Sequence, residues 1–183
     1  MNKEFSDFIY ERHINRLVHF TDKSNFDSII KYGILSINEL KNLNIQHSSN
    51  DLARHDNEPD HISLSITNHN KDVLQSFINK GSIKEPIFIY VNPYIIANNN
   101  DVIFCDRNAA ASSCKKGKSL DDFKRLFVDN IEYSTTSKGL QKYDRQNRGL
   151  NEPTDLQAEI LVKNRIQLCY ILSICDSNKN ILY

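Results

Sequence analysis

The apolar residues of this chain occur in short runs, and the length of those runs restricts the folds that are open to it. Residues 87–91 (IFIYV) form one of the longest runs, which has the length of a β-strand and is far too short to cross a bilayer. Residues 61–67 are apolar at alternate positions (Ile62, Leu64, Ile66), the pattern of a half-buried strand. Helical spacing appears in other segments, for example at Phe26, Ile29 and Ile30 before a terminating Gly33.

Strands and helices are expected to be interspersed along the chain. The patterns predict strands over residues 17–21, 61–67, 87–91, 101–105, 159–162 and 168–175, and helices over residues 4–12, 26–32, 38–43, 71–79 and 120–127. The polar segments 46–60 and 134–155 are interpreted as loops. This order is typical of an α+β fold rather than of a regular series of parallel βαβ units. The sequence contains no glycine-rich phosphate loop, so any dinucleotide must be held in another way.

Composition limits the class of protein further. The 183 residues suffice for one domain, predicted over 1–183, and 23 basic side chains balance 23 acidic ones, which excludes a general attraction to nucleic acid. The four cysteines form no CxxC pair, so free thiols are expected, and no metal site is indicated. The polar N-terminus lacks the apolar run of a signal peptide, so a cytoplasmic protein without membrane contact is expected.

Glu159 is the first candidate functional residue because it opens the apolar strand Glu159-Ile160-Leu161-Val162. One interpretation is a carboxylate on an edge strand that points to solvent. The alternative is a carboxylate that faces a cleft, since a charge in an apolar strand is costly without such a setting. There it could stabilise an oxocarbenium-like ribose while a glycosidic bond breaks, or accept a proton from a nucleophile.

Other candidates lie far from Glu159 in the sequence. His19 and Thr21 share one face of a predicted strand and could offer hydrogen bonds to a ribose or a carboxamide, although a histidine of the core is the alternative. Arg54 lies in a polar loop and could grip a pyrophosphate. Asn108 suits a turn. A basic stretch interleaved with an aromatic residue suits a single nucleic-acid strand, and it comprises Lys138, Lys142, Tyr143, Arg145 and Arg148.

Taken in order along the chain, these features resemble the DarT-type ADP-ribosyltransferases, which are toxins that attach ADP-ribose from NAD to a base in single-stranded DNA. The likeness covers roughly residues 17–174. It rests on the segments 17–21 (LVHFT), 29–36 (IIKYGILS), 50–56 (NDLARHD), 62–66 (ISLSI), 108–110 (NAA) and 157–162 (QAEILV).

The resemblance implies one ADP-ribosyltransferase domain with a split central β-sandwich, inserted helices and NAD as co-substrate, without a metal. It implies that Glu159 and Arg54 are catalytic and that segment 134–155 selects the target. The residues implied in NAD binding are His19, Thr21, Gly33, Leu35 and Asn108. An antitoxin partner, either a binding protein or a de-ADP-ribosylating hydrolase, and a role in a toxin-antitoxin or phage-defence system are also implied.

Two other functions remain open from the sequence. The first is the same chemistry on RNA, which would keep the NAD residues and change only the target-selecting segment. The second is a non-catalytic module that binds nucleic acid and leaves NAD intact. The target base cannot be identified from the residues.

Overall fold

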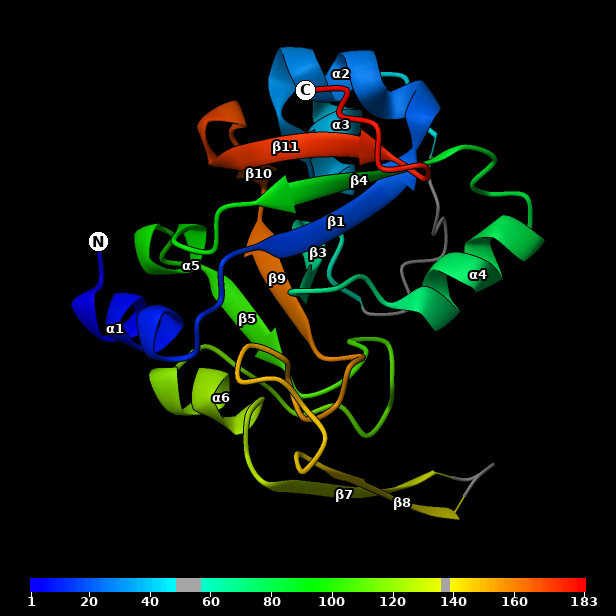
Figure 1. Cartoon of the computed structure of the whole chain (residues 1–183). Coiled ribbons are helices and arrows are strands. Elements are labelled where there is room, and N and C mark those ends of the chain that lie inside the picture. The colour runs from blue at the N-terminus through cyan, green and yellow to red at the C-terminus, as the bar shows by residue number, and fades with distance from the viewer. Residues whose placement is uncertain (49–56, 136–138) are drawn as a thin grey trace.

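The centre of the protein is an antiparallel sheet of seven strands in the order β11-β4-β1-β3-β9-β5-β6. The computed structural model describes residues 1–48, 57–135 and 139–183. The strands of this sheet are β1 (Leu17–Asp22), β3 (His61–Ile66), β4 (Pro86–Val91), β5 (Val102–Cys105), β6 (Lys116–Gly117), β9 (Glu159–Lys163) and β11 (Ile171–Asp176). Figure 1 shows the helices distributed around it. The predicted α+β class is confirmed.

The sheet separates into two halves between β1 and β3. These strands pair only at Leu17↔Ile66 and Val18↔Ser65, whereas β1 pairs with β4 at six positions. From His19 onward, β1 therefore pairs only with β4 among the described residues, and β3 turns toward β9. Beyond these two pairs the halves of the sheet move apart (Figure 1). This separation is the split that the family resemblance implied for the centre of the fold.

The helices begin where the sequence offers capping side chains. Ser36, Asn70 and Ser119 each accept a hydrogen bond from a backbone N–H in the first turn of the following helix. The remaining elements are α1 (Lys3–Glu11), η1 (Lys23–Asn25), α2 (Phe26–Tyr32), β2 (Ile34–Leu35), α3 (Ile37–Asn42), α4 (Lys71–Asn79), α5 (Ile95–Asn98), α6 (Leu120–Arg125), β10 (Arg165–Ile166) and η2 (Leu168–Tyr170). No helix within the described ranges is long and apolar enough to span a membrane.

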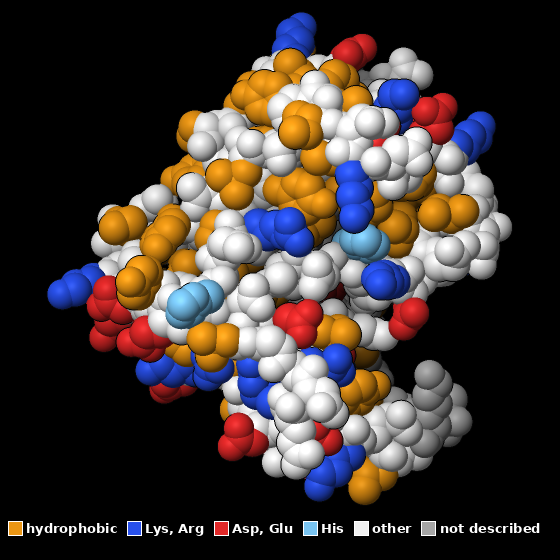
Figure 2. Space-filling model, viewed as in Figure 1, with side chains coloured by type: hydrophobic (Ala, Val, Ile, Leu, Met, Phe, Trp, Pro, Cys, Tyr) orange, Lys and Arg blue, Asp and Glu red, His pale blue; other side chains and the backbone are white. Residues whose placement is uncertain are grey.

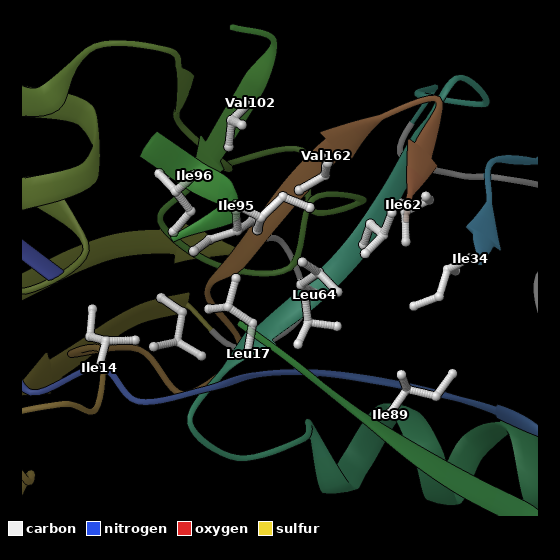
Figure 3. Close-up of a cluster of buried hydrophobic side chains, with 14 of the residues drawn as sticks. Ile14, Leu17, Ile34, Ile62, Leu64, Ile89, Ile95, Ile96, Val102 and Val162 are labelled. Atoms are coloured by element: carbon white, nitrogen blue, oxygen red, sulfur yellow. The ribbon is translucent and has the colours of Figure 1, made fainter. Parts of the chain in front are cut away.

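The main hydrophobic core contains residues from both halves of the sheet. Ile62 and Leu64 of β3 point into it, together with Leu17 from β1 and Val162 from β9 (Figure 3). The alternation predicted for residues 61–67 is therefore confirmed. Since successive side chains of a strand point to opposite faces, the serines of β3 lie on the other face.

The segment that was interpreted as a polar loop, 134–155, departs from its prediction. Its first part belongs to a hairpin of β7 (Asn130–Thr135) and β8 (Gly139–Asp144), which forms a separate two-stranded sheet. Figure 2 shows this hairpin as a projection with a deep notch between it and the body. The loop interpretation was wrong here because the part of β8 that lies in this segment shows no apolar alternation, since its two large apolar side chains, Leu140 and Tyr143, point to opposite faces of the hairpin. The strand predicted over 168–175 likewise starts later, at Ile171, after a 3₁₀ turn.

Candidate active site

A cleft of about 580 Å³ opens where β1 and β3 diverge. This volume lies within the range of roughly 300–1,000 Å³ found for small-molecule sites. Its walls come from β1, β3, the start of β9, the α2–β2 connection, α4 and the segment that follows β5. Six residues singled out from the sequence line it: His19, Thr21, Gly33, Leu35, Asn108 and Glu159.

Glu159 lies at the start of an internal strand and not on the edge of the sheet. Its strand β9 is flanked by β3 on one side and β5 on the other, with Ser65 and Cys105 as the partners of Glu159. The edge-strand interpretation is therefore excluded. The side chain is half-buried and lines the cleft.

Two donors from the segment after β5 orient the Glu159 carboxylate. The backbone N–H of Ala109 donates to Oε2 at 2.7 Å, and Nδ2 of Asn108 donates to Oε1 at 3.4 Å. Asn108 also uses its Oδ1 to accept from the N–H of Ala110 at 3.1 Å, so its turn chemistry and its contact with Glu159 coexist. Ala109 is buried in a small apolar cluster with Ile103, Cys105 and Leu161, which anchors this segment on β5 and β9.

His19 spans the gap that opens between the two halves of the sheet. Its Nδ1 lies 3.0 Å from the carbonyl oxygen of Ser63, which can only accept a hydrogen bond. Nδ1 therefore carries a proton and donates it to this oxygen. The ring takes the place of the ladder bonds that β1 and β3 no longer make at this level.

Thr21 lies on the same side of β1 as His19, as the two-residue period predicted, and both line the cleft. The Oγ1 atom of Thr21 accepts from Nδ2 of Asn25 at 2.8 Å. Asn25 also donates to the carbonyl oxygen of Ser48 at 2.9 Å and accepts from the N–H of Ser48 at 2.8 Å. This network attaches the chain around Ser48 to the first strand.

Gly33 and Leu35 shape a second wall of the cleft. Gly33 has a φ of +76°, and a Cβ placed there would lie 2.2 Å from the carbonyl oxygen of Ile166. Only glycine fits at this point, because both the dihedral angle and the close approach of β10 exclude a side chain. The pairs Ile34↔Ile166 and Leu35↔Arg165 then hold β2 in place.

Sequence reasoning missed several residues of the cleft. Ser63 and Ser65 line it from the face of β3 opposite the core, together with the buried His61. Burial lowers the pKa of His61, against the opposing effect of the Glu58 and Asp101 carboxylates. The polar alternation of β3 was the available signal, but it is equally typical of a strand facing solvent.

The hairpin is connected to the residues that hold Glu159. Arg107, directly before Asn108, is buried, and its guanidinium carbon lies 3.3 Å from the centre of the Tyr133 ring in β7. Tyr133 in turn stacks on Tyr143 of β8, with ring centres 5.6 Å apart. A movement of the hairpin would therefore act on the segment that orients the carboxylate.

Four of the residues predicted to bind nucleic acid lie within the described ranges, on β8 and the chain after it and outside the cleft lining: Lys142, Tyr143, Arg145 and Arg148. Lys142 is exposed and pairs with Glu132 at 3.1 Å. Arg145 donates to the backbone carbonyl oxygens of Gly149 and Glu152, so its guanidinium shapes the following turn. Basic and acidic side chains mix where this region meets the body (Figure 2). Their contact with nucleic acid stays a prediction.

Arg54 and Lys138 lie outside the described residues. Within the described residues, no group of three or more His, Cys, Asp or Glu side chains is arranged to hold a metal ion.

Comparison with known protein families shows which family this chain belongs to. Residues 18–182 match the model of the DarT family, described as ssDNA thymidine ADP-ribosyltransferase. The chain belongs to the DarT family. This confirms the resemblance drawn from the sequence, since the match covers nearly the whole chain. No curated protein sequence matches it.

Solved DarT structures share the fold. Thermosipho africanus DarTG in complex with ADP-ribose aligns with a TM-score of 0.59 and 17% identity, over 89% of this chain. The chain spans 44% of the length of that protein. Thermus sp. 2.9 DarT aligns in complex with ADP-ribosylated ssDNA (TM-score 0.58, 15% identity, 90% of this chain and 82% of that one). It also aligns in complex with carba-NAD⁺ (TM-score 0.56, 16% identity, 89% and 82%).

Proposed function

We propose that this protein transfers ADP-ribose from NAD to the base of thymidine in single-stranded DNA. Membership of the DarT family supports this reaction class. The observation that carries the proposal is the gathering of Glu159, Asn108 and His19 on one cleft of a size suited to a dinucleotide. Thermus sp. 2.9 DarT, which shares the fold, is known in complexes with NAD⁺ and with ADP-ribosylated ssDNA.

The proposed reaction breaks the glycosidic bond between the nicotinamide nitrogen and C1′ of its ribose. The bonding electrons leave with nicotinamide, which becomes neutral, and positive charge develops on the ribose. The Glu159 carboxylate, held by the donors at Asn108 and Ala109, stabilises this charge. Because the donors fix the carboxylate before the reaction, little reorganisation is needed in the transition state.

The acceptor in thymine follows from its chemistry. N1 of the base already carries the deoxyribose, so N3 is the ring nitrogen that remains to attack C1′. Its N–H proton leaves as the new bond forms, and the Glu159 carboxylate is a suitable base. N3 lies on the edge that pairs with adenine in a duplex, so the base must be unpaired to react.

The hairpin is the proposed guide for the DNA strand. On its second strand, the ring of Tyr143 suits stacking on an unpaired base, and the cation of Lys142, on the opposite face of the hairpin, suits a contact with the phosphate backbone. The stack of Arg107 on Tyr133 would transmit strand binding to Asn108. This protein is further proposed to act in the cytoplasm and to be neutralised by an antitoxin, either a binding protein or a hydrolase that removes ADP-ribose.

The test is transfer of label from radiolabelled NAD to matched oligonucleotides. Single-stranded DNA with thymidine should be labelled, whereas DNA without thymidine, duplex DNA and RNA should not. Glu159→Gln should reduce labelling by about a hundredfold or more, the effect typical of losing a transition-state electrostatic group. Glu85→Gln is the matched control, because Glu85 is exposed, pairs with Lys23 at the surface and does not line the cleft. Labelling of RNA alone would contradict the proposed substrate, and intact NAD with every oligonucleotide would contradict the enzyme.

A further inference from the structure

One side of α4 forms a wall of the cleft to which the proposed mechanism assigns no role. Lys80 follows the helix with helical backbone angles (φ −78°, ψ −8°), so the periodicity of α4 extends to it. The side chains of α4 and of this C-cap residue that line the cleft are Val73, Ser76, Phe77 and Lys80. Residues three and four positions apart lie on the same side of a helix, so these side chains form one continuous surface.

Lys80 brings a positive charge to this surface. Among the described residues that line the cleft, it is the only lysine or arginine, and Glu159 is the only acidic residue. Lys80 lines the cleft and is exposed, which places it at the mouth. The ion pairs found between described residues do not involve it. Its ammonium group is therefore available to a ligand that carries negative charge.

Lys80 and Glu159 lie toward opposite ends of the cleft. Glu159 pairs with Ser65 of β3, at the level where β3 still pairs with β1. The chain that follows α4 is attached to the other end of β1, where the N–H of Lys84 donates to Asp22 at 2.7 Å. Between these two levels β1 extends by about 13 Å. Figure 1 likewise shows the C-terminal end of α4 well separated from the start of β9.

The diphosphate of a dinucleotide matches this arrangement of charges. In the proposed reaction the nicotinamide ribose lies at Glu159, so the two negative charges of the diphosphate lie further along the cleft. The Glu159 carboxylate repels them and the Lys80 ammonium attracts them, so both interactions favour a diphosphate that is displaced toward the end of α4. The ammonium group of lysine is also a common binding group for phosphate oxygens in proteins.

The neighbours of Lys80 on the same surface suit the adenosine that follows the diphosphate. Phe77 lies one turn earlier on the helix and is half-buried. Its ring centre lies 6.3 Å from that of Phe20, which also lines the cleft. Two neighbouring apolar rings offer a surface against which a planar base can pack. This side of α4 thus supplies a cation for the phosphates and an aromatic side chain for the base.

We propose that Lys80 binds the diphosphate of NAD and so fixes the direction in which the co-substrate lies in the cleft. The nicotinamide ribose is then held at Glu159, and the adenosine packs beside Phe77. This inference rests on the proposed function, since that function assigns NAD to the cleft. Lys80 takes no part in bond breaking and acts by orienting the co-substrate.

The experiment measures the affinity for NAD by calorimetry in wild type, Lys80→Gln and Lys80→Arg. Lys80→Gln should weaken NAD binding by about threefold to tenfold, because an exposed cation is partly screened by water, and ADP-ribose should show the same loss. Lys80→Arg keeps the charge and should restore most of the affinity. Added salt should weaken binding to wild type and narrow its difference from Lys80→Gln. Lys71→Gln is the matched control, because Lys71 is an exposed lysine of the same helix that does not line the cleft.

The outcomes separate this inference from the proposed function. Wild-type binding of NAD with unchanged affinity in Lys80→Gln would overturn the inference and leave the proposed function standing. An equal loss in Lys71→Gln would overturn it as well, since the effect would then come from net charge alone. A raised KM for the oligonucleotide with an unchanged KM for NAD would assign Lys80 to the DNA strand and overturn it too. Failure of wild type to bind NAD would overturn the proposed function and this inference together.

Discussion

Replacing Gly33 by alanine should destabilise the protein far more than the same change at another glycine with a positive φ. Gly33 has a φ of +76° and a ψ of −169°, a region that is essentially restricted to glycine. Holding alanine there costs about 1–3 kcal/mol of unfolding free energy. The new methyl group would also lie 2.2 Å from the carbonyl oxygen of Ile166, which belongs to the backbone and cannot rotate away.

The overlap adds a second contribution to the destabilisation. Ile166 is fully buried and paired with Ile34, so relief requires separation of β2 from β10. Such overpacking costs about 1–3 kcal/mol, which brings the expected loss for Gly33→Ala to about 2–6 kcal/mol. For a chain of this length, that corresponds to a fall in melting temperature of about 4–24 °C.

The assay is chemical and thermal unfolding of Gly33→Ala beside Gly81→Ala. Gly81 has a φ of +72°, but nothing lies within 4 Å of the point that an added methyl group would occupy, so its variant measures backbone strain alone. We expect a loss of about 1–2 kcal/mol for Gly81→Ala. Equal losses for the two variants would refute the argument, because they would mean that β10 moves away from the added methyl group without any loss of unfolding free energy.

The remaining predictions concern a pH-dependent carboxylate and the support of Glu159. Burial alone would raise the pKa of Asp22, but hydrogen bonds from Ser24, Lys84 and Glu85 lower it from 3.8 to about 2. Asp22 should therefore contribute about 2 kcal/mol of stability above pH 4 that is lost as the pH falls toward 2. Urea unfolding across this range should show the loss in wild type and not in Asp22→Asn, and parallel curves would contradict it. Asn108→Ala should lower the rate of DNA labelling by about tenfold, since Ala109 still holds Oε2, and an unchanged rate would show that the 3.4 Å contact is dispensable.

Much of the local structure could be predicted from the sequence because its causes are local. The alternation of Ile62, Leu64 and Ile66 predicts which face of β3 is buried, and that face is in the core. The spacing of His19 and Thr21 places them on one side of β1. The strand β8 was predicted as a loop because its sequence shows no apolar alternation. It is held instead by its pairing with β7 and by the stack of Tyr133 on Tyr143.

The sequence by itself determined the α+β class, the family and the strand position of Glu159, because short-range patterns and motifs carry this information. Only the tertiary structure decided what meets Glu159. Asn108 lies 51 residues earlier and reaches it because β5 pairs with β9 in the register Cys105↔Glu159.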